Sequence, residues 1–438
     1  GYMNASCLRA LGKDAVYILQ KEILMAVPKS FGNPASKRRC GPSGSSSNDG
    51  GYSVWKTIGD TTDPFLCMPR HIGLHLFRNI NKTPLQQKED LVKVSYGTKL
   101  PAESSFTGTL RPFQHTVVGA ITGRFRDAGA SNPSGAVLVA SCGTGKTVMT
   151  IAIICAMGRK TAIVVHKEFL LKQWADRLTS FAPTLSVGVV QRDLVEVEGR
   201  DVVLFMMHSL VMREGRYGPE TFADFGMVVF DETHHIAAKT FVRSAGLFPA
   251  QFRLGLTATP NRADGLGYLL TWVLGPVVCE ASRDDGNKVS VLTVDNPTPY
   301  KPIHDRFGDI SYVKMVTRVV EDPRRTARVA TLVSSIVRGD TRRCILVASD
   351  RVGHLRTLLR VCADLDPDVC MGLYIGATSK RDREAREENG RSCQVLFTTF
   401  RMGEEGLDIP RMNTLVLASP KKQIEQLVGR ITRGKIKR

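Results

Sequence analysis

The sequence predicts an α/β protein with two parallel-sheet lobes in tandem and a small N-terminal region. From about residue 106, short apolar runs alternate with segments of helical period, which is typical of βαβ units. The alternation breaks near residues 280–300 and then resumes. We therefore expect an accessory region over 1–105, a first lobe over 106–280, a linker or insertion over 281–322 and a second lobe over 323–438.

The N-terminal region, residues 1–105, precedes this alternation. We expect a helix over Ala15–Val27. Residues 33–53 are rich in Gly, Ser, Pro and Asn, and such residues bury little apolar surface. We expect this stretch to form a flexible loop.

Buried strands are expected where apolar residues run together between turn residues. Such runs read as strands of a parallel sheet that is covered by helices on both faces. In the first lobe the runs are Ala136–Ala140, Thr161–Val165, Val202–Met206, Met227–Phe230 and Leu254–Leu256. In the second lobe they are Cys344–Ala348, Gly372–Ile375, Gln394–Thr398 and Thr414–Ala418.

Composition limits the class of protein and the kind of ligand. The 438 residues include 60 Lys and Arg against 42 Asp and Glu, which gives a formal net charge of +18. Hydrophobic residues make up 42% and charged residues 23%, which excludes collagen, coiled coil and wholesale disorder. A surface this basic suits a polyanion, with nucleic acid as the first candidate; a basic surface without such a ligand is the alternative.

The ten cysteines form no Cys-x-x-Cys pair and no group with zinc-finger spacing. Reduced thiols in an intracellular compartment fit this pattern best. Apolar runs such as Ile151–Met157 are too short to span a bilayer, so we expect no membrane partner. Because the sequence begins with Gly1 rather than Met, we expect an N-terminus that is missing or processed.

A glycine-rich loop follows the first expected strand and precedes a helical run. In Ser141–Thr147, Gly143 and Gly145 let successive backbone N–H groups point at phosphate oxygens. Lys146 supplies a charge for the β- and γ-phosphates, and the Thr147 hydroxyl can bind Mg²⁺. The general pattern has glycine where Ala140 stands, so a chance glycine-rich turn is the alternative.

A pair of carboxylates follows the strand Met227–Phe230. In an open α/β sheet, ligands bind at the carboxyl ends of the strands, so Asp231 is placed to hold Mg²⁺. Glu232 would orient and polarise the attacking water. A helix-capping acidic pair is the alternative for these two residues taken alone. The next residues, His234 and His235, do not share a face, which argues against zinc.

Together these residues resemble the superfamily 2 helicases, in the branch that includes XPB and UvsW-like enzymes. The resemblance runs from about 108 to 435. The matching segments are Leu110–Gln114, Ser141–Thr147, Val165–Trp174, Met207–Leu210, Asp231–His234 (the DExH box), Gly255–Pro260, Ile345–Ser349, Phe397–Pro410 and Gln426–Arg433.

Within this superfamily the chain looks most like the XPB-related helicases of large DNA viruses, and more distantly like poxvirus transcript-release helicases. HKEFLLKQW, FGMVVFDETHHIAAKTF and FRLGLTATPNRADGL carry the likeness, and Met68–Leu74 resembles a segment that these proteins have before the core. One departure is that XPB proteins have Arg-Glu-Asp where this chain has Arg262-Ala263-Asp264.

The resemblance implies two RecA-like lobes that use ATP with Mg²⁺. It implies catalytic roles for Lys146, Asp231, Glu232, Arg430 and Arg433, with Thr147 and Asp231 at the metal. The implied ATP-binding residues are Arg111, Gln114, Gly143, Thr144, Gly145, Lys146, Thr147, Gly406, Asp408 and Gln426. The residues that would couple hydrolysis to the nucleic acid strand are His234, Thr257 and Thr259.

Nucleic acid is expected to contact both lobes through side chains that bind its sugar-phosphate backbone. The candidates are His166, Lys167, Ser209, Arg262, Ser349, Thr399 and Arg401. Trp174 could stack on a base. Because a Trp on the apolar face of a helix is more often part of the core, we leave it out of the candidates. Residues 300–325 are where we look for an element that separates strands.

The functional hypothesis is an ATP-driven motor on duplex DNA or RNA–DNA hybrid, with DNA favoured over RNA by the likeness. It would act in viral-type transcription, recombination or repair, within a transcription or repair complex, in the nucleus, the cytoplasm or a virion. A non-hydrolysing scaffold that holds nucleic acid for a polymerase complex is the second hypothesis. The motor part of a restriction or nuclease assembly is the third.

Overall fold

The computed structural model describes most of the chain from residue 94 onward. The described residues are 70–71, 94–128, 134–141, 143–212, 217–233, 238–258, 267–281, 289–295, 299–376, 379–405, 409, 411–421 and 424–432, with the backbone alone of 2–3, 25–26, 52–53, 56–58 and 65–67. The chain divides into two compact units, Gly1–Ser282 and Arg283–Arg438. No helix of the described part is long and apolar enough to cross a membrane.

Short antiparallel strands occupy the described parts of the N-terminal region. Strand β5 (Phe65–Cys67) pairs with both β1 (Tyr2–Met3) and β4 (Lys56–Ile58), and β2 (Met25–Ala26) pairs with β3 (Tyr52–Ser53). The helix that we predicted over Ala15–Val27 is therefore wrong at its end, because Met25 and Ala26 are extended and paired. The remainder of that prediction, and nearly all of the predicted 33–53 loop, lies outside the described residues.

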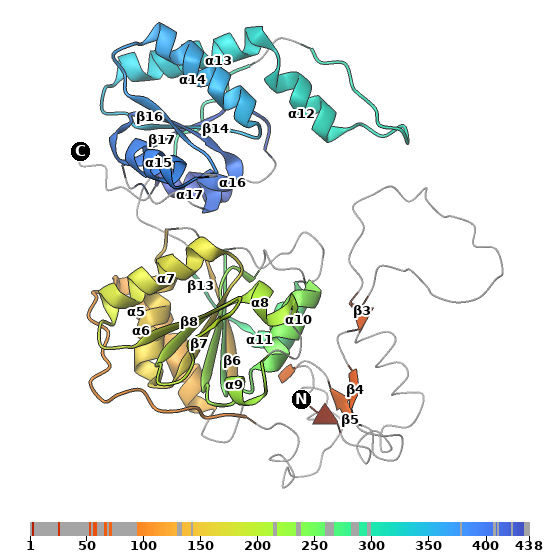
Figure 1. The fold of residues 1–438 in the computed structure, drawn as a ribbon, viewed down its shortest axis with the longest axis vertical. Coiled ribbons are helices and arrows are strands. Elements are labelled where there is room, and N and C mark those ends of the chain that lie inside the picture. The colour runs from red at the N-terminus through yellow and green to blue at the C-terminus, as the bar shows by residue number, and fades with distance from the viewer. Residues whose placement is uncertain are drawn as a thin grey trace, which may run out of the picture. The chain divides into compact units, whose positions relative to one another are not determined.

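A sheet of eight described strands forms the centre of the first unit (Figure 1). The spatial order is β13-β6-β12-β11-β7-β10-β8-β9, and every pair is parallel except β8 with β9. The strands are β6 (Ser134–Ala140), β7 (Thr161–Val165), β8 (Val187–Gln191), β9 (Leu194–Val195), β10 (Val202–Met206), β11 (Met227–Phe230), β12 (Phe252–Thr257) and β13 (Val277–Ala281).

Helices cover both faces of this sheet because its strands are apolar on both sides. Along β6, Ala136 and Leu138 pack in one apolar cluster, and Val137 and Val139 pack in another. The first cluster includes α5 (Pro112–Asp127), α6 (Lys146–Met157) and α7 (Glu168–Phe181). The second includes α8 (Met207–Met212), α9 (Glu220–Ala223), α10 (Ala238–Leu247) and α11 (Tyr268–Leu274).

Two buried arginines close the amino-terminal edge of this sheet. The Arg253 guanidinium donates to carbonyl groups of Ala245, Phe248 and Val273, at or just after the ends of α10 and α11, at 3.0–3.1 Å. Such bonds satisfy carbonyls that a helix end leaves without intrahelical partners. Arg70 belongs to Met68–Leu74, the segment that resembles one found before the core of XPB-related viral helicases. It donates to the Ala250 carbonyl at 2.7 Å. That segment therefore contacts the base of the first unit.

The second unit contains a smaller sheet of four described strands, all parallel. Its order is β15-β16-β14-β17, from β14 (Ile345–Ser349), β15 (Met371–Tyr374), β16 (Val395–Thr399) and β17 (Thr414–Leu417). Helices α13 (Pro323–Gly339) and α14 (Val352–Leu365) share one apolar cluster with it. The other described helices are α12 (Tyr312–Val320), α15 (Lys380–Ser392), α16 (Phe400–Glu405) and α17 (Glu425–Ile431).

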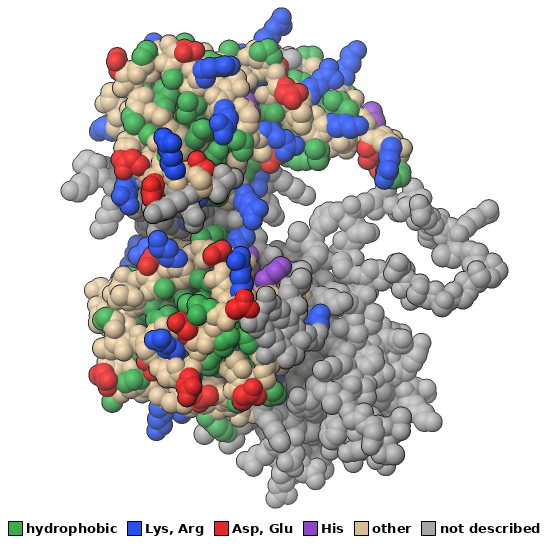
Figure 2. Space-filling view, viewed as in Figure 1, with side chains coloured by type: hydrophobic (Ala, Val, Ile, Leu, Met, Phe, Trp, Pro, Cys, Tyr) green, Lys and Arg blue, Asp and Glu red, His purple; other side chains and the backbone are tan. Residues whose placement is uncertain are grey.

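The predicted fold class, two RecA-like parallel-sheet lobes after a small N-terminal region, is confirmed. Every predicted strand is present with its ends within about two residues of the expected bounds. Strands β8, β9 and β13 were not predicted. Lys and Arg side chains are spread over the visible face of the second unit rather than gathered in one patch (Figure 2).

Candidate nucleotide-binding site

The phosphate loop is formed at the carboxyl end of β6, which is buried along its whole length. Gly143 (φ 83°) and Gly145 (φ 90°) both adopt the left-handed conformation that glycine tolerates best. Thr144 is fully buried between them, and its hydroxyl donates to the Ser141 carbonyl at 2.7 Å. Because α6 begins directly after Gly145, its free N–H groups and dipole are aimed at the loop.

Gln114 connects the loop to the segment ahead of it. Its Nε2 donates to the Thr144 carbonyl at 2.7 Å, and its Oε1 accepts from the Arg111 backbone N–H at 2.8 Å. A Cβ atom on Gly145 would lie only 2.5 Å from Gln114 Nε2. The predicted ATP-binding residues Arg111, Gln114, Thr144 and Gly145 are thus brought together.

Lys146 and Glu232, two of the predicted catalytic residues, are in direct contact. Lys146 Nζ lies 3.2 Å from Glu232 Oε1 and donates to the Ala140 carbonyl at 3.2 Å. Both side chains are mostly buried, with 11% and 18% exposed. The ammonium group is therefore held at the mouth of the loop by the end of β6 and by the acidic pair after β11.

Asp231 is buried at the end of β11, where its carboxylate accepts from Trp174 Nε1 at 2.8 Å. Burial, and after it the negative charge of Glu232, raise the Asp231 pKa to about 6. Lys146 and the Trp174 hydrogen bond act in the opposite direction. Because water stabilises this buried carboxylate poorly, a bound cation would stabilise its negative charge.

Trp174 is the functional residue that the sequence analysis missed. It is 1% exposed and lies in the core of the first unit, as expected, but its one polar atom binds the acidic pair. The sequence offered one signal for this contact. A buried Trp N–H group usually finds a hydrogen-bond acceptor, and Asp231 follows β11, which pairs with the strand β7 that precedes the Trp174 helix. Its indole is not available for stacking on a base.

Glu232 has a backbone conformation that is unusual for a residue with a side chain. Its φ of 47° lies in the left-handed region, which costs a non-glycine residue on the order of 1 kcal/mol. The next residue, Thr233, is buried, and its hydroxyl donates to the Leu256 carbonyl at 3.4 Å. That bond links the acidic pair to the end of β12, where the predicted coupling residue Thr257 is fully buried.

The predicted Mg²⁺ ligands fit a magnesium ion by their chemistry. Thr147 offers a hydroxyl in the first turn of α6, and Asp231 offers the buried carboxylate described above. Mg²⁺ usually binds one or two protein oxygens and takes the rest from substrate phosphates and water. No group of three or more His, Cys, Asp or Glu side chains suited to a metal occurs in the described part of the chain.

The nucleic-acid candidates of the first unit differ in accessibility. His166 and Lys167 are half-buried between β7 and α7. Ser209 is buried, and its hydroxyl accepts from the Arg192 backbone N–H at 2.9 Å. The remaining predictions of this unit, His234, Thr259 and Arg262, lie outside the described residues.

In the second unit, Arg430 on α17 is bound within its own unit. Its Nε donates to the Glu404 carbonyl at 3.1 Å, and its Nη2 donates to the same oxygen. Lys421 forms a 3.0 Å ion pair with the Glu404 carboxylate. Gln426 lies half-buried on the same helix. The predicted residues Gly406, Asp408 and Arg433 lie outside the described residues.

The strand ends of the second unit bring its three predicted nucleic-acid contacts to one edge. Ser349 ends β14 but is fully buried, with its hydroxyl 2.9 Å from His354 Nδ1. Thr399 ends β16 and is half-buried, and Arg401 follows on α16 with an exposed side chain. Of these three, Arg401 is the most accessible to a phosphate in this conformation.

Two parallel-sheet lobes, one with a phosphate loop and an acidic pair at the same sheet edge, define the class of two-lobed nucleoside-triphosphate-driven motors. Residues 107–262 match the family described as the type III restriction enzyme res subunit, and 327–435 match the helicase conserved C-terminal domain. The chain belongs to the superfamily 2 helicases, as its motifs predicted.

Several named proteins are similar in sequence. L396 of Acanthamoeba polyphaga mimivirus, named as a candidate ATP-dependent RNA helicase, is 31% identical over 84% of this chain and 69% of that protein. The DNA 3'-5' translocase XPB2 of Sulfurisphaera tokodaii is 24% identical over 69% of this chain and 75% of that protein. The XPB subunit of general transcription and DNA repair factor IIH from Schizosaccharomyces pombe is 24% identical over 80% of this chain, but the match spans 45% of that protein.

Among solved structures, a fragment described as an HsdR subunit of a type I restriction enzyme from Vibrio vulnificus is similar in fold. The TM-score is 0.53 at 16% identity, over 76% of this chain and 62% of that chain. At this identity the likeness supports the fold alone.

Proposed function

We propose that this chain is an ATP-driven motor that moves on duplex DNA or RNA–DNA hybrid. The observation that carries the proposal is the contact between Lys146 and Glu232, beside the buried Asp231, at the mouth of a glycine loop. A scaffold that never hydrolyses ATP has no need of a buried acidic pair next to a phosphate-binding lysine. Burying these charges is costly unless they serve a ligand or a reaction.

The residues have separate roles in the proposed hydrolysis. Loop N–H groups around Gly143 and Gly145 and the Lys146 ammonium bind the β- and γ-phosphates. Thr147 and Asp231 would hold Mg²⁺, which would neutralise charge on the phosphates. Glu232 orients the attacking water and accepts its proton. When nucleotide arrives, the γ-phosphate gives Lys146 a second anionic partner, which frees Glu232 to bind that water.

Arg430 and Arg433 supply positive charge to the transition state in this proposal. An arginine of this kind contributes about 10³–10⁵ in rate. Arg430 is bound to the Glu404 carbonyl, so engaging a phosphate requires it to exchange a neutral acceptor for an anionic one. Charge-assisted bonds are about twice as strong as neutral ones, which favours that exchange.

DNA is the favoured polymer, although the similar proteins carry names of both kinds. One is named as an RNA helicase and another as a DNA translocase. The likeness to XPB supports work on DNA in transcription, recombination or repair, inside a cell or a virion, with a polymerase or repair complex as partner.

Strand separation needs an element that enters the duplex, and a hairpin of the second unit has suitable chemistry. His304 and Ile310 pair as an antiparallel bridge, and the Asp305 carboxylate accepts from the Phe307 backbone N–H at 2.8 Å. Phe307 is 73% exposed at the tip, with the Arg306 guanidinium 4.8 Å from its ring centre. An exposed ring beside a cation suits stacking on bases.

We expect Phe307→Ala to lower unwinding of a tailed duplex about tenfold while leaving polymer-stimulated ATP hydrolysis within about twofold, since one base stack is worth about 1–3 kcal/mol. Strand displacement and phosphate release are measured on the same preparation. Tyr312→Ala, at a neighbouring exposed aromatic outside the tip, is the matched control. Equal unwinding by the three proteins would remove the hairpin from the proposal.

The main test measures ATP hydrolysis by the whole chain without polymer and with duplex DNA, single-stranded DNA, RNA or RNA–DNA hybrid. Glu232→Gln is the inactive control. Stimulation by duplex DNA or hybrid, absent in the variant, is the expected result. Stimulation by RNA alone would assign the chain to RNA remodelling. Nucleotide binding without hydrolysis on any polymer would contradict the motor and favour the scaffold.

A further inference from the structure

Two cysteines of the second unit lie close together although they are far apart in the sequence. Cys370 directly precedes β15, and Cys393 directly follows α15 and lies two residues before β16. Their Sγ atoms are 3.3 Å apart, which is closer than ordinary contact between two sulfur atoms, and both cysteines are free thiols. Disulfide formation requires the two sulfur atoms to approach from 3.3 Å to about 2.05 Å.

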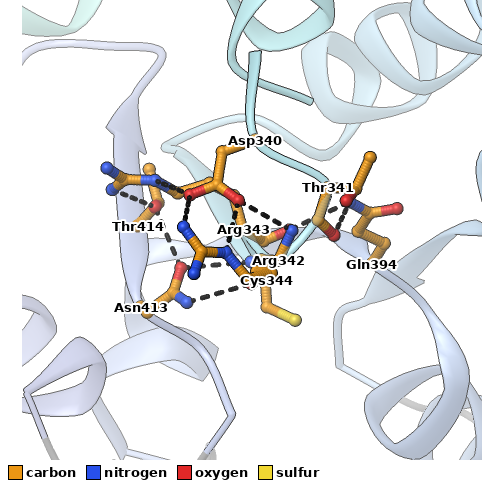
Figure 3. A network of polar contacts seen from close by, with 8 residues as sticks. All are labelled: Asp340, Thr341, Arg342, Arg343, Cys344, Gln394, Asn413 and Thr414. Atoms are coloured by element: carbon orange, nitrogen blue, oxygen red, sulfur yellow. Dashed lines mark hydrogen bonds and ion pairs between the residues drawn. The ribbon is translucent and has the colours of Figure 1, made fainter. Parts of the chain in front are cut away.

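The backbone around the pair is held in place from several sides. The Cys370 carbonyl accepts from the Gln394 backbone N–H at 2.8 Å, which sets the register of the two chain segments. The Gln394 side chain donates in turn to the carbonyls of Thr341 and Arg343 at 3.0 and 3.1 Å. Figure 3 shows this polar network, which ties Gln394, Asn413 and Thr414 to the 340–344 turn. Hydrogen bonds of the Gln394 backbone and side chain therefore hold the chain segment that carries Cys393.

The two thiols differ in access to solvent. Cys370 is exposed, whereas Cys393 is 2% exposed. Gly372 packs closely on the buried sulfur, and a Cβ atom at that position would lie 2.8 Å from it. Burial raises the pKa of the Cys393 thiol to about 11, and the Cys370 thiol adds to the shift. An oxidant from solvent therefore meets Cys370 first.

We propose that Cys370 and Cys393 form an oxidation site at which a peroxide converts the two thiols into a reversible intramolecular disulfide. Neither residue belongs to the nucleotide site or to the proposed nucleic-acid contacts. The inference is independent of the proposed function.

The chemistry proceeds in two balanced steps. The Cys370 thiolate attacks one oxygen of hydrogen peroxide, the O–O bond breaks, and sulfenic acid and hydroxide form. The Cys393 sulfur, on losing its proton, then attacks the Cys370 sulfur and expels the sulfenic oxygen as hydroxide. The two released protons neutralise the two hydroxides. Two thiols and one peroxide give one disulfide and two waters, and any small thiol reverses the reaction by exchange.

The disulfide would fasten the end of α15 to the start of β15. Arg411 already donates to the carbonyls of Gly390, Ser392 and Cys393 at this end of the helix. Closing the chain between residues 370 and 393 reduces the entropy of the unfolded state, so the oxidised lobe should resist unfolding. We expect a rise in Tm of about 5 °C, which the reductant abolishes.

The test oxidises the reduced whole chain with hydrogen peroxide, alkylates the remaining thiols and maps tryptic peptides without reduction. The expected product joins peptide 361–380, which contains Cys370, to peptide 392–401, which contains Cys393. Fragmentation distinguishes Cys370 from Cys362 in the first peptide. The cross-link should vanish on reduction.

Three single variants sharpen the result. Cys393→Ser should leave a sulfenic acid on Cys370 that dimedone traps, and Cys370→Ser should leave Cys393 alkylated. Cys344→Ser, at a half-buried cysteine of the same network, should still form the cross-link. The proposal is overturned if Cys370 is oxidised to sulfinic acid while Cys393 stays alkylated, if Cys370 pairs with Cys362, or if neither thiol reacts. The wild-type peptide map decides these outcomes even if a variant folds poorly.

Discussion

The carboxyl ends of the two sheets each bury one ionisable side chain, and the two respond to pH in opposite ways. Asp231 follows β11 in the first unit and is bound by Trp174, with its pKa raised to about 6 by burial. His354 follows β14 in the second unit and is bound by Ser349, with its pKa lowered to about 4 by burial and by the charge of Arg325. Both sites favour the neutral form, so one suppresses a negative charge and the other a positive charge.

The comparison extends to the principal cation of each site. Lys146 contacts a carboxylate, whereas Arg430 contacts a carbonyl of its own unit. The first unit therefore holds its charged side chains in contact with one another. In the second unit, Arg430 donates to the neutral carbonyl group of Glu404. The fold alone does not explain this difference, because both units have the same parallel architecture.

Removing the Arg430 guanidinium should have the largest effect on ATP hydrolysis. We expect Arg430→Ala to lower the kcat of ATP hydrolysis about 10³–10⁵-fold with nucleotide affinity changed less than tenfold, since the arginine is proposed to act in the transition state. Steady-state phosphate release and nucleotide titration measure the two quantities. Arg342→Ala, at an exposed arginine of the same unit, is the matched control. A comparable loss of affinity in Arg430→Ala would place its role in ground-state binding.

Neutralising the first unit's buried carboxylate should abolish magnesium-dependent hydrolysis while stabilising the free protein. Below pH about 4 Asp231 is protonated in both states, and as pH rises through about 6 the folded state loses stability. Asp231→Asn should therefore raise Tm more at pH 8 than at pH 5, where about half of this loss has occurred. The gain is at most about 3 kcal/mol, at about 1.4 kcal/mol per pKa unit. Thermal unfolding without nucleotide or metal checks this, and a lower Tm at pH 8 would contradict it.

Removal of the indole N–H should have a smaller effect on the same carboxylate. Trp174→Phe deletes the hydrogen bond that favours ionised Asp231, so the pKa of Asp231 should move above about 6. ATP hydrolysis at limiting Mg²⁺ should then lose more activity between pH 8 and pH 6.5 than the wild type does. The lost bond and altered packing should cost about 1–3 kcal/mol in stability. Trp272→Phe, on α11, should leave the pH profile unchanged.

The smallest effect is expected at His354. Between pH about 6.5 and about 4 the unfolded chain binds the proton more tightly, so the second unit loses stability as pH falls through this range. His354→Asn keeps a polar atom near Ser349 and removes the titration. Its free energy of unfolding should fall less between pH 7 and pH 4.5 than that of the wild type, by about 2 kcal/mol, and Tm measured over this range reports the difference. Parallel slopes for the two proteins would show that His354 does not carry the acid sensitivity.

The sequence predicted most of the fold because buried parallel strands are continuous apolar runs. Strand β8 was missed because its residues alternate between buried and half-buried, which gives no such run. The error at Met25–Ala26 has a different cause, since a two-residue pairing with Tyr52–Ser53 overrides a local helical pattern.

The candidate site was predictable where its residues follow each other in motifs, and less so where contacts join distant segments. Lys146, Asp231 and Glu232 were identified from their positions after strands. The bond from Trp174 to Asp231 spans 57 residues and left no local pattern. Likewise the sequence could not tell that the hydroxyls of Ser209 and Ser349 are buried and bonded within the protein.

The close approach between Gly145 and Gln114 has a consequence for how this protein can evolve. A side chain at position 145 would meet the Gln114 amide, which holds the Thr144 carbonyl. Position 145 is therefore constrained twice, by this contact and by its φ of 90°. A change at Gln114 would relieve the contact but not the backbone strain, so glycine should persist at position 145 in lineages that alter the segment ahead of the phosphate loop.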